Sequence, residues 1–301
     1  MSLRYLLIDV FTERPFGGNQ LAVFPDAEGI DPALLQPIAR ELNFTETTFV
    51  YPPRENDHAA RLRIFTPDAE VPYAGHPVIG TAFALEAESQ LSTDLASIHI
   101  ELEGGLVPVR LQRSEAGELL QATMTQERPQ FLGQFHQSEL VAAALGLESS
   151  EIAITGLPCE VVSTGLPFHI VPVGDLDAMR RIQIHPDKLD ELTRVLGVGD
   201  LFVFCFETID PTATVHCRMF APSFGIPEDP ATGSASGCLG AYLVKNRVVP
   251  LKKLTRIISE QGLEMGRPSR VSIEVESSEG RISAVRVGGS AVVVGEGTLR
   301  V

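Results

Sequence analysis

The sequence lacks the features that would assign it to nucleic acids, membranes or secretion. Lysine and arginine total 24 against 39 acidic residues, which gives a net charge of −15, and no basic run occurs. Nucleic acids and anionic membranes require clustered Lys and Arg, so neither is an expected partner. No stretch of about 18 apolar residues is available to span a membrane, and the start MSLRYLLIDVF is too weak for a signal peptide. We therefore expect a cytoplasmic protein.

Motifs for disulfides, metals and common cofactors are also missing. The cysteines at positions 159, 205, 217 and 238 have no CxxC spacing, so free thiols are expected. The seven histidines form neither HxH nor HExxH, and neither GxGxxG nor a GxxxxGK[ST] loop is present. We therefore expect no metal and no cofactor, and NAD and ATP are poor candidates.

What the chain does contain indicates a folded protein rich in turns and strands. It has 301 residues, of which 44% are hydrophobic and 15 are phenylalanine, enough to bury a large apolar surface. Its 26 glycines and 21 prolines indicate many turns. The length predicts two domains.

An internal repeat supports two domains. Residues 63–72 (RIFTPDAEVP) match residues 218–227 (RMFAPSFGIP) in Arg, Phe and both prolines, at an offset of 155 residues. Residues 76–82 (HPVIGTA) then match residues 229–235 (DPATGSA) at an offset of 153 residues. A period of about half the chain predicts two homologous halves rather than a solenoid of short units.

Each half is expected to be rich in strands and to contain few helices. Apolar patterning predicts a hairpin around residues 17–19 and a helix that begins with Asp31 as its N-cap. The expected strands are residues 5–11, 21–24, 46–52, 59–66, 97–103 and 106–112 in the first half, and 160–162, 168–171, 201–206 and 214–220 in the second. Residues 77–85 and 234–244 are apolar or small on every side, which predicts buried helices with close packing at Gly80, Gly237 and Gly240. The predicted class is α+β, with an antiparallel sheet wrapped around a central helix in each half.

The loops before these two helices are candidate ligand sites. Free N–H groups at a helix start carry the positive end of the helix dipole and favour an anion. If the halves face one another, two helix starts supply donors to one cleft, and a small carboxylate fits this better than a phosphate. Such local donors would hold an anion despite the negative net charge.

Four ionisable or polar residues lie in or near these loops, and each has an ordinary alternative role. His76, Asp229 and Ser234 are each suited to capping a helix or completing a loop, and Glu46 is suited to an exposed strand face. However, His76 and Asp229 occupy matching positions in the repeat. A carboxylate and an imidazole on either side of one carbon are what proton abstraction and return require.

At these residues the chain resembles the PhzF family of phenazine-biosynthesis-like proteins. The resemblance rests on NFTETTF (43–49), on RIFTP with VPYAGHP (63–77), on RMFAP with EDPATGSA (218–235), and on QGLEMGRP (261–268). It implies the diaminopimelate epimerase fold, with two pseudo-symmetric halves, an active site between them and a homodimer. We expect the first domain to comprise residues 1–118, completed by residues 286–301, and the second to comprise residues 119–285.

The resemblance also implies an activity and roles for individual residues. The family's type member isomerises trans-2,3-dihydro-3-hydroxyanthranilate without metal or cofactor, through a glutamate that abstracts and returns a proton. By motif match, Glu46 is the acid/base, and His76 and Asp229 assist it. Ser234 and the backbone N–H groups near it, at Gly75 and Gly233, would bind the substrate carboxylate. The turn at residues 17–19 departs from the family pattern because Gln20 stands where Pro is common, so no substrate role is assigned there.

Two alternatives to this isomerase remain open. One is a binding protein that keeps the fold without catalysis, and the other is an epimerase-like enzyme acting on another substrate. Related racemases use two cysteines as opposed bases, but neither matching loop contains one, and Cys238 lies about one helical turn further inward. Racemisation by two thiols is therefore disfavoured.

Overall fold

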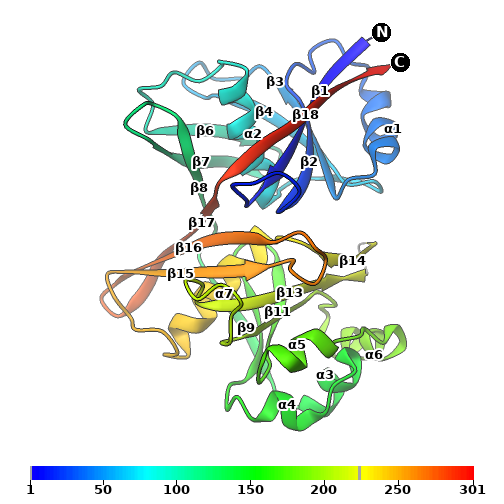
Figure 1. The fold of residues 1–301 in the computed structure, drawn as a ribbon, viewed down its shortest axis with the longest axis vertical. Coiled ribbons are helices and arrows are strands. Elements are labelled where there is room, and N and C mark those ends of the chain that lie inside the picture. The colour runs from blue at the N-terminus through cyan, green and yellow to red at the C-terminus, as the bar shows by residue number, and fades with distance from the viewer. Residues whose placement is uncertain (1, 223–224) are drawn as a thin grey trace. The chain divides into compact units, whose positions relative to one another are not determined.

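The computed structural model describes residues 2–222 and 225–301, and its chain divides into two compact units (Figure 1). We call residues 1–125 with 288–301 unit 1, and residues 126–287 unit 2. Residues 223 and 224 of the second repeat motif lie outside the described residues.

Unit 1 is a sheet with two helices. Its elements are β1 (Ser2–Val10), β2 (Asn19–Phe24), α1 (Pro32–Leu42), β3 (Glu46–Tyr51), β4 (Ala60–Phe65), β5 (Glu70–Val71), α2 (Gly75–Ala87), β6 (Ser97–Leu102), β7 (Gly105–Arg113), β8 (Leu119–Thr125) and β18 (Ala291–Arg300). β1 pairs antiparallel with β2 and β18, and α1 crosses over so that β3 lies parallel to β2. β4 pairs antiparallel with β3 and parallel with β6, and β7 continues antiparallel between β6 and β8.

Unit 2 repeats this order of strand pairings and adds helices. Its elements are β9 (Gln130–Phe135), α3 (Ser138–Leu145), α4 (Ser149–Ala153), β10 (Cys159–Ser163), β11 (Pro167–Pro172), α5 (Leu176–Arg181), α6 (Pro186–Leu196), β12 (Leu201–Cys205), β13 (Val215–Ala221), β14 (Ile226–Asp229), α7 (Gly233–Lys245), β15 (Leu254–Gln261), β16 (Ser269–Ser278) and β17 (Arg281–Gly289). β10 and β11 are antiparallel, β11 and β12 parallel, and β12 and β13 antiparallel. β13 is then parallel to β15, which is antiparallel to β16.

The start of unit 1 forms as its local sequence predicts. Asp31 is the N-cap of α1, since its Oδ1 accepts the Ala33 N–H at 2.9 Å, and Pro32 occupies the first helical position. Gly18 has a φ of +60°, and a Cβ there would collide with the Val10 carbonyl, so the turn between β1 and β2 requires glycine. Both the expected hairpin and the expected helix start are confirmed.

The helices α2 and α7 are each buried along nearly their whole length. Every residue of α2 from Gly75 to Leu85 is buried, and α2 packs against β1, β2, β3, β8 and β18. A Cβ at Gly80 would lie 2.6 Å from Leu21 Cδ2, so this glycine permits close approach to the sheet. A Cβ at Gly240 of α7 would likewise lie 2.5 Å from Ile273 Cγ2. The close packing expected at these glycines is confirmed.

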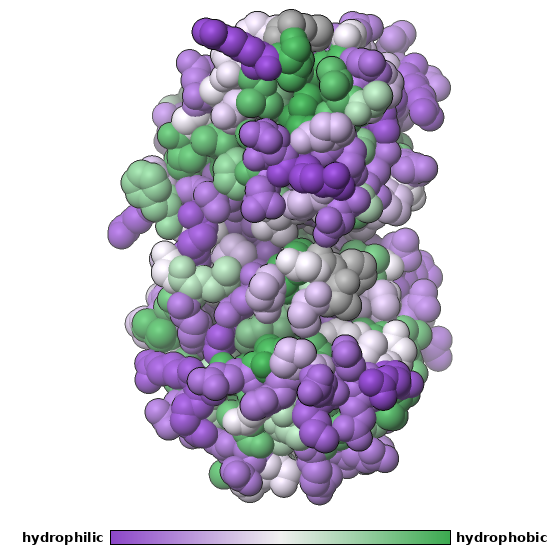
Figure 2. All heavy atoms as spheres, turned by 90° about the vertical axis from the view of Figure 1, so that its right-hand side faces the viewer, coloured by the Kyte–Doolittle hydropathy of each residue, from purple (hydrophilic) through white to green (hydrophobic). Residues whose placement is uncertain are grey.

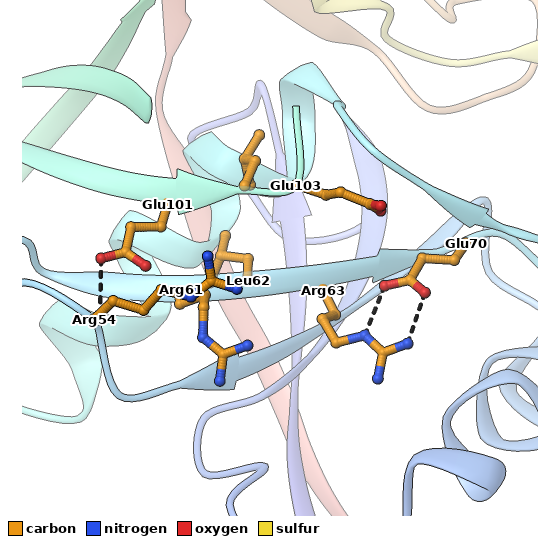
Figure 3. A pocket seen from close by; sticks show the side chains of 8 residues that line it. Arg54, Arg61, Leu62, Arg63, Glu70, Glu101 and Glu103 are labelled. Atoms are coloured by element: carbon orange, nitrogen blue, oxygen red, sulfur yellow. Dashed lines mark hydrogen bonds and ion pairs between the residues drawn. The ribbon is translucent and has the colours of Figure 1, made fainter. Parts of the chain in front are cut away.

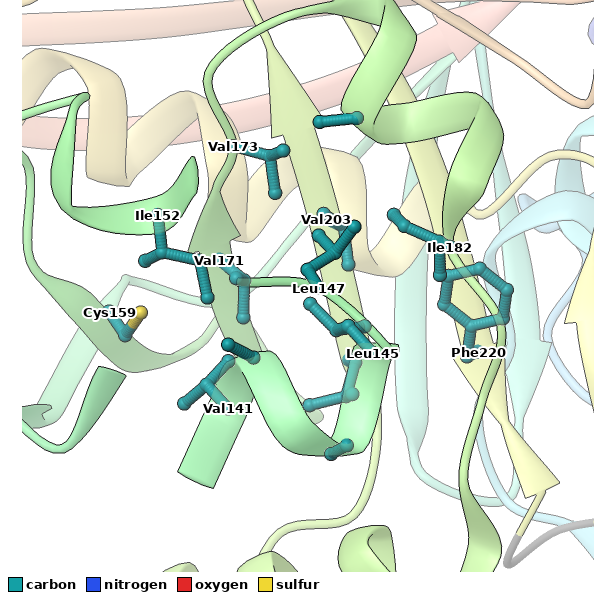
Figure 4. Close-up of a cluster of buried hydrophobic side chains, with 14 of the residues drawn as sticks. Val141, Leu145, Leu147, Ile152, Cys159, Val171, Val173, Ile182, Val203 and Phe220 are labelled. Carbon is teal, nitrogen blue, oxygen red and sulfur yellow. The ribbon is translucent and has the colours of Figure 1, made fainter. Parts of the chain in front are cut away.

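Unit 2 contains helices that the sequence did not reveal individually. Helices α3, α4, α5 and α6 were not predicted. They pack with strands of unit 2 around a hydrophobic core (Figure 4). Its buried members include Val141, Leu145, Ile152, Val171, Val203 and Phe220. The helices escaped prediction because they are short, from 5 to 11 residues, so the helical period has few turns in which to show.

Among the described residues, no helix has both the length and the apolar character to cross a membrane. Figure 2 shows hydrophilic residues spread over the face presented there, with smaller hydrophobic patches between them.

All four cysteines are free, as the absence of CxxC spacing led us to expect, and all four are buried.

Candidate active-site residues

In unit 1, three side chains distant in sequence meet at the start of α2. Glu46 is the first residue of β3 and pairs with Leu21 of the parallel strand β2. His76 lies in the first turn of α2, and its Nδ1 is 3.1 Å from Glu46 Oε2. Asn19, the first residue of β2, places its Nδ2 3.5 Å from the same His76 nitrogen. The fold therefore joins a carboxylate, an imidazole and an amide.

His76 is held in its neutral form. Only 6% of the residue is exposed, and burial lowers its pKa to about 3 because the charged imidazolium loses its hydration. His76 Nε2 is buried and has no hydrogen-bond partner within the residues that the structure describes. Glu46 keeps 15% of its side chain exposed. The pair therefore combines a solvent-accessible carboxylate with a neutral imidazole whose buried Nε2 makes no hydrogen bond within the described residues.

His76 is not the N-cap of α2. The N-cap of α2 is Ala74, which offers no side-chain cap, and His76 is inside the helix. Gly75 is the first helical residue and is buried. The N–H groups of this first turn thus have no capping side chain from the preceding residue.

In unit 2, Asp229, Gly233 and Ser234 lie around the start of α7. Asp229 is the last residue of β14 and is 5% exposed, and its Oδ2 accepts a hydrogen bond from Thr232 Oγ1. Thr232 is the N-cap of α7, but its side chain makes no cap bond. The ordinary alternatives for Asp229 and Ser234 as N-caps are therefore wrong, because Asp229 precedes the cap and Ser234 follows it.

Several residues that hold this helix start were missed from the sequence. Gln261 hydrogen-bonds the turn from Asp229 to Thr232, and Gln126 Nε2 donates to the Gly233 carbonyl at 3.0 Å. Thr164 Oγ1 in turn donates to Gln126 Oε1 at 2.8 Å. Gln261 opens the QGLEMGRP motif, but a buried amide has no sequence pattern that reveals its partners.

Cys238 is a buried packing residue, as expected. It is fully buried inside α7, and burial raises the pKa of its thiol to about 12. Its Sγ lies 3.2 Å from Thr164 Oγ1. A thiol in this state is protonated at neutral pH and is not a nucleophile.

Six candidate residues thus fall into two groups. Glu46, Gly75 and His76 gather in unit 1, while Asp229, Gly233 and Ser234 gather in unit 2. That both groups serve one substrate stays a prediction. Within residues 2–222 and 225–301, no group of three or more His, Cys, Asp or Glu side chains is suitably placed to hold a metal ion.

A pocket of about 420 Å³ in unit 1 lies elsewhere (Figure 3). It is open to solvent, and none of the six candidate residues lines it. Its walls carry three arginines and three glutamates, namely Arg54, Arg61, Arg63, Glu70, Glu101 and Glu103. Two neighbouring side chains of this wall, Arg63 and Glu70, form a doubly hydrogen-bonded pair.

Comparison with known proteins gives consistent results over the whole chain. The family model described as phenazine biosynthesis-like protein, PhzC-PhzF, matches residues 8–297. The trans-2,3-dihydro-3-hydroxyanthranilate isomerase of Pseudomonas aeruginosa is 39% identical over 296 residues, covering 98% of each chain.

Solved structures agree. A phenazine biosynthesis protein of the PhzF family from Bacillus anthracis has a TM-score of 0.91 and 31% identity, covering 100% of each chain. A probable proline racemase from Agrobacterium radiobacter, at 14% identity and a TM-score of 0.65, covers 99% of this chain and 93% of that one, and shares the fold alone. The fold is mixed α and β and mostly sheet, and the names of the curated relatives support an isomerase. The chain belongs to the phenazine biosynthesis-like PhzC-PhzF family.

Proposed function

We propose that the protein is an isomerase that moves a proton on a small unsaturated or cyclic carboxylate, without metal or cofactor, with Glu46 as general acid and base. The observation that carries this proposal is the 3.1 Å approach of Glu46 to a buried, neutral His76. A general base must be within reach of the proton that it takes, and the Glu46 carboxylate, with 15% of its side chain exposed, can be reached by a ligand.

The proposed step conserves atoms and charge. Glu46 takes a proton from a carbon beside the unsaturated system, and the electron pair left behind shifts along the conjugated bonds. The protonated Glu46 then returns the proton to another carbon, so the double bond moves and the carboxylate is regenerated. His76 remains neutral throughout, and its Nε2 hydrogen-bonds a polar group of the substrate.

Unit 2 supplies the second half of the proposed site. We infer that the two units are pseudo-symmetric copies, each with its sheet wrapped around its buried helix, and that Asp229 assists the proton transfer. Gly75, Gly233 and Ser234 would bind the substrate carboxylate through N–H groups at the starts of α2 and α7. The lack of a side-chain cap on either helix supports this, since uncapped N–H groups bind anions.

The substrate class follows from the relatives. The Pseudomonas aeruginosa relative is named for trans-2,3-dihydro-3-hydroxyanthranilate, and that amino acid is the first substrate to test. An epimerase-like reaction on another carboxylate is the alternative, and binding without turnover is the second. As the family resemblance implies, we also propose a homodimer, which light scattering of the purified protein would test. We further propose the cytoplasmic location that the sequence led us to expect.

Incubation with trans-2,3-dihydro-3-hydroxyanthranilate in D₂O tests the proposal. We expect isomerised product carrying solvent deuterium, and we expect Glu46→Gln to lower kcat by about 10²- to 10⁴-fold. Glu41→Gln, on the exposed face of α1, is the matched control and should keep the wild-type rate. Wild-type turnover by Glu46→Gln would contradict the role of Glu46. Deuterium exchange without a shifted double bond would favour the epimerase, and binding without exchange would favour the binding protein.

A further inference from the structure

The turn between β14 and α7 is held from both ends by one buried side chain. Gln261, the last residue of β15, is fully buried. Its Nε2 donates to the backbone carbonyl of Asp229 at 2.7 Å and to Thr232 Oγ1 at 3.1 Å. Its Oε1 accepts the Thr232 N–H at 3.1 Å. Three hydrogen bonds from one amide thus fix the first and last residues of the turn.

Gly262 and Ser269 hold the middle of the turn through contacts with Pro230. Gly262 has a φ of +76°, and a Cβ there would lie 2.5 Å from the Pro230 carbonyl oxygen. Any other residue would therefore strain the backbone and push the turn away. Ser269 Oγ bridges the Pro230 and Gln261 carbonyl oxygens at 2.7 and 2.9 Å.

The same contacts reach the carboxylate of Asp229. Gln261 Nε2 donates to Thr232 Oγ1, and Thr232 Oγ1 donates to Asp229 Oδ2, so the hydroxyl is a relay between the amide and the acid. The Asp229 backbone is held by the same Nε2. Rotation of the carboxylate is restrained from both its backbone and its oxygen end.

The fold itself does not require this amide. In unit 1, Glu101 accepts the N–H groups of residues 54 and 55, and in unit 2, Glu260 accepts those of residues 209 and 210, so the two glutamates correspond. The residue after each is Leu102 in β6 and Gln261 in β15. A strand, turn and buried helix therefore form in unit 1 with a leucine at this position.

We propose that Gln261 is the positioning residue for Asp229 and sets the direction in which that carboxylate meets the substrate. The inference rests on the proposed function, in which Asp229 assists the proton shift. Gln261 touches no substrate in this scheme and acts only through the turn.

The test uses the full chain, three single variants, and the Asp229→Asn background with and without Gln261→Met. Gln261→Met removes all three hydrogen bonds, and Gln261→Leu removes them with the residue that stands at the matching position of unit 1. Ser259→Ala is the matched control, since Ser259 is buried on the same strand but bonds Cys217 Sγ instead of the turn. Amide hydrogen exchange at Thr232 and steady-state kinetics on trans-2,3-dihydro-3-hydroxyanthranilate are measured for each.

We expect both Gln261 variants to speed Thr232 exchange by at least about tenfold, and Ser259→Ala to leave it unchanged. We expect kcat to fall by about 10- to 100-fold in the Gln261 variants, with KM changed by less than about twofold. In the Asp229→Asn background, Gln261→Met should cause little further loss, because it acts through the group already removed.

Three outcomes would overturn the inference. They are unchanged Thr232 exchange in Gln261→Met, an unchanged kcat despite a large loss in Asp229→Asn, and a full additional loss in the double variant. Failure of the proposed function looks different. If the wild type does not turn the substrate over, or Asp229→Asn retains full activity, the assignment of the site fails, while Thr232 exchange still decides whether Gln261 holds the turn.

Discussion

Arg63 in unit 1 and Arg218 in unit 2 form the same ion pair in different surroundings. Arg63 Nε and Nη2 donate to the two oxygens of Glu70 at 2.7 and 2.6 Å, and Arg218 uses the same nitrogens toward Glu228 at 2.8 and 2.8 Å. Both arginines come from matching positions of the repeat. The acceptor glutamate does not match in the same way, because it lies 7 residues after the arginine in unit 1 and 10 residues after it in unit 2.

The two ion pairs differ in how far neighbouring residues bury them. In unit 2, Arg218 Nη1 also donates to the Met179 carbonyl of α5 at 2.7 Å, and only 8% of its side chain is exposed. In unit 1, 30% of the Arg63 side chain is exposed, and Arg63 lines the open pocket of Figure 3. The helix added to unit 2 thus converts a surface ion pair into a buried one, and burial rather than geometry decides what each pair contributes to stability.

The largest expected effect comes from removing Arg218, and removal of Arg63 is the comparison. Arg218→Met leaves Glu228, with only 18% of its side chain exposed, without its partner and should lower the free energy of unfolding by about 3 kcal/mol. Arg63→Met should lower it by less than about 1 kcal/mol, because water replaces the partner. Urea unfolding followed by far-UV circular dichroism measures both, and equal losses would refute the comparison.

A second reporter assigns the loss to one unit. All four cysteines lie in unit 2, at positions 159, 205, 217 and 238, and all are buried. Arg218→Met should accelerate thiol alkylation under native conditions, whereas Arg63→Met should not.

The pH dependence should also separate the units. Burial disfavours the charged form of His216, but the carboxylates of Glu260 and Glu264 outweigh it and raise the His216 pKa to about 9. Its stabilising contribution is complete below pH 6.5 and is lost as the pH rises toward 9, by up to about 1.4 kcal/mol per pH unit. The matching position in unit 1 holds Arg61 instead of a histidine. Urea unfolding at a series of alkaline pH values should show a fall in the free energy of unfolding with rising pH, and His216→Gln should remove this fall.

At acid pH, the free energy of unfolding changes with pH in the opposite direction. Burial lowers the pKa of His169 in unit 2 to about 4, and neither of its ring nitrogens has a partner among the described residues. Since the unfolded state binds the proton first, stability falls as the pH drops from 6.5 toward 4. His169→Phe should make this acid limb shallower. An unchanged slope would show that His169 is charged in the folded protein.

The smallest expected effect concerns two helix caps. Asp31 caps α1 in unit 1, and Asp175 caps α5 in unit 2, where its Oδ1 accepts the Ala178 N–H at 2.8 Å. Either substitution to Ala should cost about 1 kcal/mol. Only Asp175→Ala should also raise thiol reactivity, because α5 covers Arg218. A similar rise in Asp31→Ala would break the link between α5 and the buried pair.

The sequence predicted much of unit 1 because its elements carry strong local signals. The Gly18 turn, the Asp31 cap and the apolar run from Pro77 each specify one structure without help from distant residues. Strands β15, β16 and β17 were not predicted, whereas a C-terminal strand was expected at about residues 286–301. Strand β18 alternates between half-buried and exposed residues and owes its place to pairing with β1, which no local pattern reveals.

The sequence indicated which residues belong to the candidate site, but not how their side chains contact one another. The motifs identified Glu46 and His76, but their approach depends on how β3 and α2 pack, and burial of His76 is a property of the whole of unit 1. Gln261 was quoted only as part of a motif. Its three hydrogen bonds join β15 to the turn before α7, and only the folded chain brings these segments together.

The pairing of β1 with β18 sets an order for folding during synthesis. Leu3 pairs with Leu299, so the second residue pair of the β1 ladder joins segments almost 300 positions apart. At ribosomal rates of about 5–20 residues per second, the first strand waits roughly 15–60 s for its partner. Residues 126–287 are continuous, but their last strand is made only shortly before β18. The edge of β1 that faces β18 therefore stays open during most of synthesis, and it is exposed to chaperones and to wrong pairing in that time.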